Sequence, residues 1–400
     1  MECTGCLDEL EASTTSYPPP LSERRLNRLA LILTEICNIA CPYCYEHRDP
    51  DTFYNPERSK RNMSEEGAID ILQRAYQLWP RIGTLFFFGG EPLLKKKVIK
   101  HICEVVINNE IIGMRKAPRF GLVTNATLLD EEAIQLIEQF DISINVSLDG
   151  PPEVNDLTRI TKRRAGTSEV TLQNLLKLRS RGINYEIEAT FSKFHLMAGI
   201  SVMDLMDYFY DVHDIRVLHA PWVSADKNDS YYLTDDEIFN AYEPAIKYSM
   251  ENLRKGIPKV IFFVDKWLRI LQSYDPAAMR PYCPACFSEI SVNAAGDIYP
   301  CFMFNGLQEL KIGNVYNDKF FQEVNQAVIE AFYHTIFGPC DCPPEYQQFH
   351  SGCVGSDRIA TNSIVSKPYC NIYSKLLEVF LAEVRKGVGQ PFRQKLPVII

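Results

Sequence analysis

The chain has 400 residues, of which 46% are hydrophobic and 13 are cysteines, and its formal net charge is −9. This negative charge disfavours a surface built to bind nucleic acid. No apolar run reaches the roughly 18 residues of a membrane-spanning helix, and the N-terminus, MECTGCLDELEASTTSYPPPLSERR, lacks the apolar core of a secretion signal. We therefore expect a cytoplasmic protein with no nucleic-acid or membrane partner.

Strand-like and helix-like segments alternate after an N-terminal tail, residues 1–28, that we expect to be flexible. The predicted strands are 29–34, 84–88, 120–124, 142–148, 184–190 and 215–220. Ser64, Asp130 and Ser168 stand where they would cap the intervening helices, and Cys103 falls on an apolar helix face. This order predicts an α/β fold with a parallel sheet, either an open partial barrel or a doubly wound sheet.

The composition changes in the last third of the chain. We expect the α/β domain to span residues 29–250, followed by a bridging helical segment over 251–282. Residues 283–375 are rich in Cys, Pro and Gly, and 376–400 are expected to form a C-terminal helix and tail. The change near residue 283 predicts a second, smaller domain.

The cysteines are clustered along the chain. Cys37, Cys41 and Cys44 share one loop directly after the first predicted strand, and seven others lie between residues 283 and 370. In a chain without an export signal, clustered thiols indicate metal ligation rather than disulfides. Two sites remain open for the first loop: zinc completed by His47, or an iron–sulfur cluster with one iron left open.

The spacing Cys-x3-Cys-x2-Cys, with Tyr43 before the third cysteine, resembles that of the radical S-adenosylmethionine (radical SAM) enzymes. The resemblance implies a partial (β/α)6 barrel and a catalytic [4Fe–4S] cluster held by Cys37, Cys41 and Cys44. In that family the open iron binds S-adenosylmethionine. The reduced cluster cleaves it to a 5′-deoxyadenosyl radical, which abstracts a hydrogen atom from the substrate.

Three further strand ends, FFFGGEPLL, LVTNAT and NVSLDGPPEVNDLTR, resemble cofactor-binding segments of that family. By this resemblance the residues around the cofactor are Tyr43, Gly89, Gly90, Glu91, Asn125, Ser147, Asp149 and Arg159. The glycines and Glu91 would hold the cofactor's ammonium group, and Arg159 its carboxylate.

The match departs from the family in two places and leaves one assignment open. Ala126 stands where glycine is usual, and Asn155 stands where histidine is frequent. Arg163 and Arg164 are alternatives to Arg159 as the partner of the cofactor carboxylate.

The second group of cysteines contains Cys-x9-Gly-x4-Cys, which resembles the SPASM extension of radical SAM enzymes, with Gly296 at the turn of a hairpin. The resemblance implies two auxiliary iron–sulfur clusters, expected to be [4Fe–4S]. The first would use Cys283, Cys286, Cys301 and Cys353. The second would use Cys340, Cys342 and Cys370, with its fourth position taken by His350 or another group such as Tyr346, or left open.

Two alternatives for the cysteines remain open beside the hypothesis of auxiliary iron–sulfur clusters. The group after residue 283 could instead form a pair of zinc sites, because Cys-x2-Cys is a generic metal-binding spacing. Cys3 and Cys6 form a further Cys-x2-Cys in the expected tail, with no assigned role.

Enzymes with a SPASM extension mostly modify peptides, so the leading hypothesis is maturation of a ribosomally made precursor peptide (RiPP biosynthesis) by a cross-link, a thioether or backbone excision. The alternatives are formylglycine formation, as in anaerobic sulfatase maturases, and a non-catalytic, metal-stabilised peptide-binding module. Phe302 stands where sulfatase maturases carry an aspartate base, and it cannot accept a proton.

Three partners follow from the leading hypothesis. They are the precursor peptide, a one-electron donor such as flavodoxin or ferredoxin, and a separate leader-recognition protein. The last is expected because 28 residues before the first predicted strand are too few for a leader-binding domain.

Overall fold

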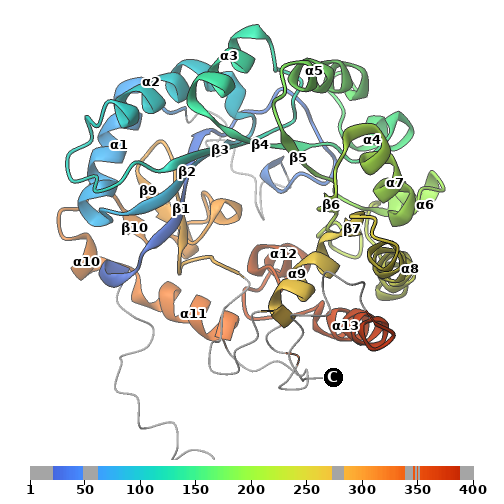
Figure 1. The fold of residues 1–400 in the computed structure, drawn as a ribbon. Coiled ribbons are helices and arrows are strands. Elements are labelled where there is room, and N and C mark those ends of the chain that lie inside the picture. The colour runs from blue at the N-terminus through green and yellow to red at the C-terminus, as the bar shows by residue number, and fades with distance from the viewer. Residues whose placement is uncertain are drawn as a thin grey trace, which may run out of the picture.

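The computed structural model describes residues 21–47, 62–272, 283–337, 346, 349 and 352–387 (Figure 1). Cys3, Cys6, Cys340, Cys342 and His350 lie outside the described residues, as does the side chain of His47. The metal-binding roles predicted for them stay predictions.

One eight-stranded sheet, in the order β10-β9-β8-β1-β2-β3-β4-β5, forms the centre of the fold. The strands are β1 (Leu26–Thr34), β2 (Ile82–Gly89), β3 (Arg119–Thr124), β4 (Ser143–Ser147), β5 (Tyr185–Glu188), β6 (Val217–Leu218), β7 (Val260–Ile261), β8 (Glu289–Val292), β9 (Asp297–Tyr299) and β10 (Gly313–Asn314). Strands β1 to β5 are parallel and lie in chain order. A doubly wound sheet would reverse its strand order, so the partial barrel is the correct one of the two predicted folds.

The six strands predicted from the sequence are all present, although the sixth is short. Strand β6 pairs with β7 in a separate two-stranded sheet. Single parallel bridges, Glu188 to His219 and Phe191 to Trp222, connect this region to the end of β5. The barrel wall therefore continues past β5 with few backbone hydrogen bonds.

The helices surround the sheet and follow its strands, as Figure 1 shows. They are α1 (Glu65–Leu78), α2 (Lys96–Ile107), α3 (Glu131–Phe140), α4 (Pro152–Thr158), α5 (Ser168–Ser180), α6 (Lys193–Met197), α7 (Val202–His213), α8 (Asp235–Arg254), α9 (Phe262–Gln272), α10 (Phe320–Glu323), α11 (Gln326–Phe337), α12 (Val354–Thr361) and α13 (Cys370–Arg385). Cys103 is fully buried on α2, as its apolar face predicted.

Two of the three predicted helix caps are confirmed. The side chains of Ser64 and Asp130 accept hydrogen bonds from backbone N–H groups in the first turns of α1 and α3. The prediction for Ser168 is wrong, because Ser168 is the first residue of α5 and makes no cap. Its N–H and hydroxyl both donate to the carboxylate of Asp156, at 2.7 and 2.6 Å.

Residues 21–28 belong to the fold, which corrects the expected boundary of the tail. Strand β1 begins at Leu26, and its outer edge pairs in parallel with β8, for example Arg28 with Glu289. The carbonyl of Leu21 accepts a hydrogen bond of 3.1 Å from the Trp79 indole. The strand begins earlier than predicted because its pairing with β2 already includes Leu26, opposite Ile82, and its pairing with β8 includes Arg28.

The Cys-rich region continues the barrel sheet. Strand β8 returns through a turn at Gly296, which has a φ of +78°, into antiparallel β9. The predicted hairpin is therefore confirmed. Its pairing with β1 places the first part of this region against the strand that precedes the Cys37 loop.

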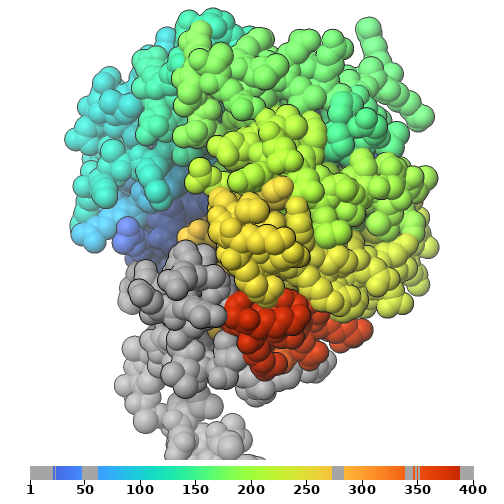
Figure 2. Space-filling model, turned by 45° about the vertical axis from the view of Figure 1, so that its right-hand side comes forward, coloured from blue at the N-terminus to red at the C-terminus, as the bar shows by residue number. Residues whose placement is uncertain are grey.

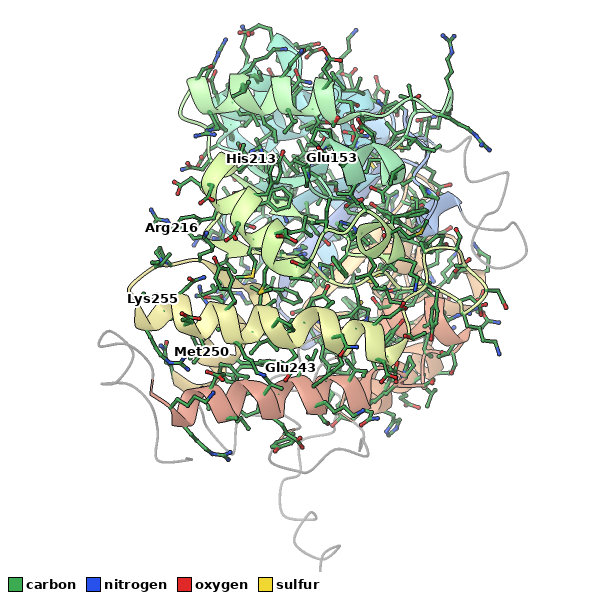
Figure 3. All side chains as sticks on the ribbon, turned by 90° about the vertical axis from the view of Figure 1, so that its right-hand side faces the viewer. Glu153, His213, Arg216, Glu243, Met250 and Lys255 are labelled. Carbon is green, nitrogen blue, oxygen red and sulfur yellow. The ribbon has the colours of Figure 1, made fainter. Side chains whose placement is uncertain are left out.

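The C-terminal helix α13 lies alongside α8, as Figure 3 shows with Glu243 and Met250 marking α8. Arg254 at the end of α8 forms an ion pair of 2.6 Å with Glu383 of α13. Figure 2 shows the red C-terminal residues directly beneath the yellow segment on this side. Within the described residues, no helix has the length and apolar character needed to cross a membrane.

Candidate active site

A cavity of about 420 Å³ lies where strands β1 to β5 end. Ten residues that the sequence placed at the cluster or the cofactor line it: Cys37, Cys41, Tyr43, Cys44, Gly89, Gly90, Glu91, Asn125, Ser147 and Arg159. Cys353, predicted for an auxiliary cluster, lines the same cavity. The structure thus brings several separate chain segments together at one site.

The two glycines at the end of β2 hold the Cys37 loop in place. The N–H of Gly90 donates to the carbonyl of Thr34, and the N–H of Glu91 donates to that of Ile36, both at 2.9 Å. A Cβ atom on Gly90 would lie 2.8 Å from the backbone nitrogen of Cys37 and would clash with Ile36. The family resemblance predicted that these glycines contact a ligand. The structure shows them in contact with the backbone of the Cys37 loop.

Glu91 connects the ends of β2 and β3. Its buried carboxylate accepts hydrogen bonds from Leu93 N (3.0 Å), Thr124 Oγ1 (2.8 Å) and Asn125 N (2.9 Å). Burial raises the pKa of Glu91 to about 7, although these three hydrogen bonds act in the opposite direction. A cationic partner in the cavity would favour the charged form, which suits the predicted role in holding an ammonium group.

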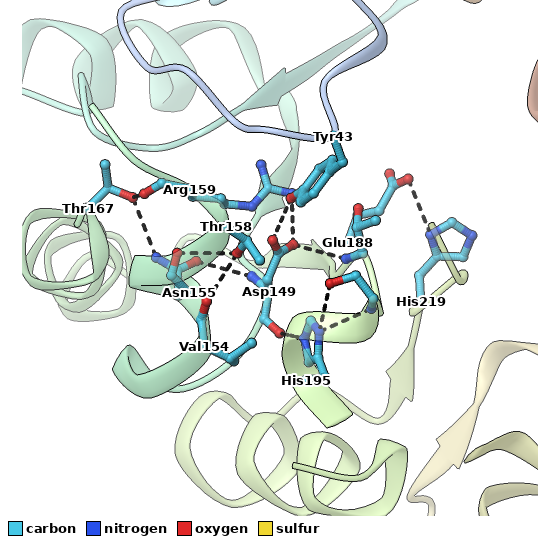
Figure 4. Close-up of polar contacts among 12 residues, drawn as sticks. Tyr43, Asp149, Val154, Asn155, Thr158, Arg159, Thr167, Glu188, His195 and His219 are labelled. Atoms are coloured by element: carbon cyan, nitrogen blue, oxygen red, sulfur yellow. Dashed lines mark hydrogen bonds and ion pairs between the residues drawn. The ribbon is translucent and has the colours of Figure 1, made fainter. Parts of the chain in front are cut away.

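Asp149 does not line the cavity, which corrects its predicted position. Its side chain is fully buried, and Figure 4 shows it among Tyr43, Arg159 and His195. The carboxylate accepts hydrogen bonds from Arg159 Nη2 (3.0 Å), the N–H of Thr190 (2.9 Å) and the Tyr43 hydroxyl. Burial by itself would raise the pKa of Asp149, but the Arg159 guanidinium, His195 and hydrogen bonds from Thr158 and Tyr43 together outweigh it, and the pKa is lowered. Asp149 therefore positions two residues that do line the cavity.

His195 holds the backbone of Asp149 from the other side (Figure 4). Its Nδ1 accepts a hydrogen bond from the N–H of Ser192 at 3.1 Å, so the proton is on Nε2. Nε2 then donates to the carbonyl of Asp149 at 2.9 Å. Burial lowers the pKa of His195, which favours this neutral form.

Arg159 presents its guanidinium to the cavity beside Tyr43, 5.8 Å from the ring centre. Its buried Nε has no hydrogen-bond partner among the described residues. A buried N–H without a partner is costly, and a ligand carboxylate would satisfy it. Arg163 and Arg164 are exposed and do not line the cavity, so the structure favours Arg159 among the three predicted arginines.

Both departures from the family pattern have a structural account. Ala126 has a φ of +60°, the left-handed conformation that glycine adopts without strain. Hydrogen bonds from Ala126 N to Thr124 Oγ1 (3.0 Å) and from Asn174 Nδ2 to Ala126 O (2.8 Å) hold it there. Asn155 is buried and accepts a hydrogen bond of 3.2 Å from the N–H of Asp149, so it supports the site from behind.

The three loop thiols are suited to a cationic metal cluster. Burial raises the pKa of Cys37 to about 11 and that of Cys41 to about 12, and it raises that of Cys44 well above its usual value. Bound metal would favour the thiolate forms. Within the described residues no three His, Cys, Asp or Glu side chains are close enough to share one ion.

The first predicted auxiliary site is partly assembled. Cys283, Cys301 and Cys353 lie near one another, and each interacts through its charge with at least one of the others. Cys283 and Cys301 are buried, and burial is the main reason that the pKa values of all three thiols are raised. Cys286 is fully buried, at a φ of +65°. Cys370 begins α13, and Cys340, Cys342 and His350, which were predicted to share its cluster, lie outside the described residues.

Sequence reasoning missed the part of the cavity lining that comes from the ends of β5 and β6 and from α13. Glu188 and His219 line the cavity at the ends of β5 and β6, with His219 Nδ1 3.7 Å from Glu188 Oε1 (Figure 4). Trp222 and Tyr373 also line the cavity, with their ring centres 4.9 Å apart and their planes tilted by 41°. The strand-end positions of Glu188 and His219 were the available signal, since residues at strand ends gather at the mouth of the barrel.

We predict that Gly90→Ala displaces the Cys37 loop, because the added methyl group overlaps the backbone of Ile36 and Cys37. Reconstituted protein should lose about four irons per chain, one cubane cluster, and should no longer form 5′-deoxyadenosine. The matched control is Gly256→Ala, which places alanine at a φ of +76° with nothing within 4 Å. Full iron content and normal cofactor cleavage in Gly90→Ala would contradict this account.

We also predict that Asp149→Asn destabilises the protein by about 3–5 kcal/mol, because the Arg159 guanidinium stays buried without its counter-charge. Denaturant unfolding of the two proteins measures the difference. Since the pKa of Asp149 is lowered in the folded state, its stabilising effect is complete above the ordinary value of about 3.9. It is lost as the pH falls through the folded-state pKa. A difference that persists unchanged at low pH would exclude the ion pair as the cause.

Comparison with known proteins agrees with this geometry. Residues 31–208 match the Radical SAM superfamily. The cysteine-type anaerobic sulfatase-maturating enzyme of Clostridium novyi (strain NT) is 23% identical over 333 residues, which cover 79% of this chain and 84% of that one.

Solved structures share the fold. The structure described as "Native anSMEcpe with bound AdoMet" has a TM-score of 0.73 at 18% identity, covering 90% of this chain and 97% of that one. Streptococcus suis SuiB bound to its precursor peptide SuiA has a TM-score of 0.54 at 14% identity, covering 77% of this chain and 66% of that one. The matched domain spans the Cys37 loop and the ends of β2 to β5, so residues 31–208 form a radical SAM domain and the chain is an enzyme.

Proposed function

We propose that the protein is a radical SAM maturase that modifies a ribosomally made precursor peptide by hydrogen-atom abstraction, forming a cross-link or thioether or excising a backbone unit. The observation that carries the proposal is the single cavity lined both by the Cys37 loop and by Cys353. A substrate in that cavity would reach the cofactor-cleaving site and the predicted auxiliary site at once. SuiB, which shares the fold, is described with a bound precursor peptide.

The residues around the cavity fit a cluster-bound S-adenosylmethionine. Bound at Cys37, Cys41 and Cys44, a [4Fe–4S] cluster with this cofactor would supply a 5′-deoxyadenosyl radical. Arg159 would hold the cofactor carboxylate through its unpaired Nε, and the segment at Glu91 would hold the ammonium group. The aromatic wall at Trp222 and Tyr373 would exclude water from the reacting atoms.

Auxiliary clusters belong to this proposal. The first is assigned to Cys283, Cys286, Cys301 and Cys353, which makes residues 283–375 a SPASM domain. The second would use Cys340, Cys342 and Cys370, with His350 or an open position as the fourth ligand. A reducing compartment, the cytoplasm, suits these free thiols, and flavodoxin or ferredoxin would supply electrons. A separate leader-recognition protein stays part of the proposal.

Formylglycine formation is the second candidate, because the Clostridium novyi relative carries that name. The position predicted for its base argues against it. Phe302 stacks on Phe88 at 4.1 Å and places a hydrocarbon ring in the cavity wall. A non-catalytic binding module would not need the three loop cysteines, Glu91 and Arg159 gathered around one cavity.

Replacing Cys37, Cys41 and Cys44 together by alanine should abolish 5′-deoxyadenosine formation with dithionite, because each thiolate holds one iron. Iron should fall from about twelve to about eight per chain if both auxiliary clusters are cubanes. Chromatographic analysis and iron determination on anaerobic protein measure both quantities. Cofactor cleavage by the triple variant, or zinc in place of iron, would contradict the proposal.

We predict that a sulfatase-derived peptide carrying the target cysteine is not converted to formylglycine, because Phe302 supplies no base. Mass spectrometry of the peptide after incubation with S-adenosylmethionine and dithionite tests this, and cofactor cleavage in the same sample shows that the enzyme was active. A loss of mass that corresponds to aldehyde formation would favour the second candidate.

A further inference from the structure

Arg24 is a buried cation outside the radical SAM domain, in a segment that the sequence assigned to the tail. Only 8% of the surface of Arg24 is exposed to solvent. Its Nη1 donates a hydrogen bond of 2.5 Å to the carbonyl of Cys286, and its guanidinium lies 5.1 Å from the ring centre of Phe287. Burying a guanidinium costs free energy unless it gains partners, so this contact is a specific one.

The contact reaches a cysteine in an unusual conformation. Cys286 has a φ of +65°, which non-glycine residues seldom adopt. Its N–H is shared between the carbonyls of Glu289 (3.0 Å) and Pro300 (2.9 Å), and its own carbonyl is bonded by Arg24. These bonds fix the backbone of Cys286, and the bond to Pro300 joins it to the residue directly before Cys301.

The guanidinium also acts on the sulfur of Cys286. The charge of Arg24 and a hydrogen bond from its guanidinium reach this side chain. A guanidinium beside a sulfur atom stabilises negative charge on that sulfur. Hydrogen bonds to the sulfurs and the net charge nearby are the protein's means of setting the potential of an iron–sulfur cluster.

We propose that Arg24 is a positioning residue for the auxiliary cluster at Cys283, Cys286, Cys301 and Cys353, and that its guanidinium raises the reduction potential of that cluster. The reason is that a reduced cluster carries one more negative charge, which a buried cation stabilises. The negative charge of Glu289 acts on Cys283 and Cys301 and would lower the reduction potential of the cluster. The positive charge of Arg24 opposes that decrease. This inference rests on the auxiliary cluster of the proposed function.

Arg24→Gln and Arg24→Lys in the full-length holoenzyme test the inference, with Arg25→Gln as the matched control. Arg25 is the next residue and carries the same charge, but it is exposed to solvent and therefore screened. Iron content first shows that each variant holds its clusters. Potentiometric titration monitored by EPR then gives the midpoint potential of the auxiliary signal, identified as one that persists in the Cys37, Cys41 and Cys44 triple alanine variant.

We expect Arg24→Gln to change the ratio of oxidised to reduced cluster about tenfold at the midpoint potential of the unmodified protein, which is a fall of about 59 mV for a one-electron couple. Arg24→Lys, which keeps the charge but loses the guanidinium fork, should shift the potential in the same direction by less. Arg25→Gln should leave it unchanged.

Two results would overturn the inference, and they are distinguishable. If the auxiliary signal is present but neither Arg24 variant moves it more than Arg25→Gln does, Arg24 has no role in the potential and the proposed function stands. If the unmodified protein shows no auxiliary signal, the auxiliary cluster is absent, and that part of the proposed function fails together with the inference. If Arg24→Gln loses its iron, its cluster potential cannot be measured, and the potential of Arg24→Lys alone then tests the inference.

Discussion

The active site depends on one close approach between two pieces of backbone, the end of β2 and the loop after β1. Gly90 and Glu91 donate to carbonyls at Thr34 and Ile36, directly before Cys37. Any side chain at position 90 would occupy the space of that loop. The Glu91 carboxylate extends this connection, because it accepts a hydrogen bond from the N–H of Asn125 at the end of β3. The position of the first cluster ligand is therefore set by backbone contacts, which a change of side chain elsewhere in the cavity would not disturb.

The charged residues of the site form a second, buried layer that orients the first. Asp149 contacts Arg159 and Tyr43, and both of these line the cavity although Asp149 does not. The cost of burying the carboxylate is offset by a guanidinium whose remaining Nε lacks a partner among the described residues. Such a half-satisfied cation favours a ligand that brings a second carboxylate. The electrostatics therefore indicate an anionic group at this point of the cavity, independently of any family resemblance.

The parts of the fold that could be predicted from the sequence depend on neighbours along the chain. The strands, the cap at Ser64 and the turn at Gly296 follow from a few adjacent residues. Ser168 failed as a cap because Asp156, twelve residues earlier, binds it instead. Asp149 was predicted to lie in the cavity because its motif shows that it follows a strand end. The motif does not show on which side of the cavity wall the side chain lies. The pairing of β8 with β1 joins residues more than 250 positions apart, and no local pattern encodes it.

That long-range pairing is also what makes the chemistry of the cavity possible. Because β8 continues the barrel sheet beside β1, Phe302 reaches Phe88 on β2, and Cys353 comes to line the same cavity as the Cys37 loop. Cys353, from the second cysteine group, thus lines the same cavity as the Cys37 loop, although the two are far apart in the sequence. The ring at Phe302 makes the wall between them apolar, so a proton leaving the substrate must go elsewhere. Glu188 and His219 present their polar groups to the cavity. The cavity lining is therefore apolar at Phe302, whereas near the ends of β5 and β6 it combines the polar groups of Glu188 and His219 with the aromatic rings of Trp222 and Tyr373.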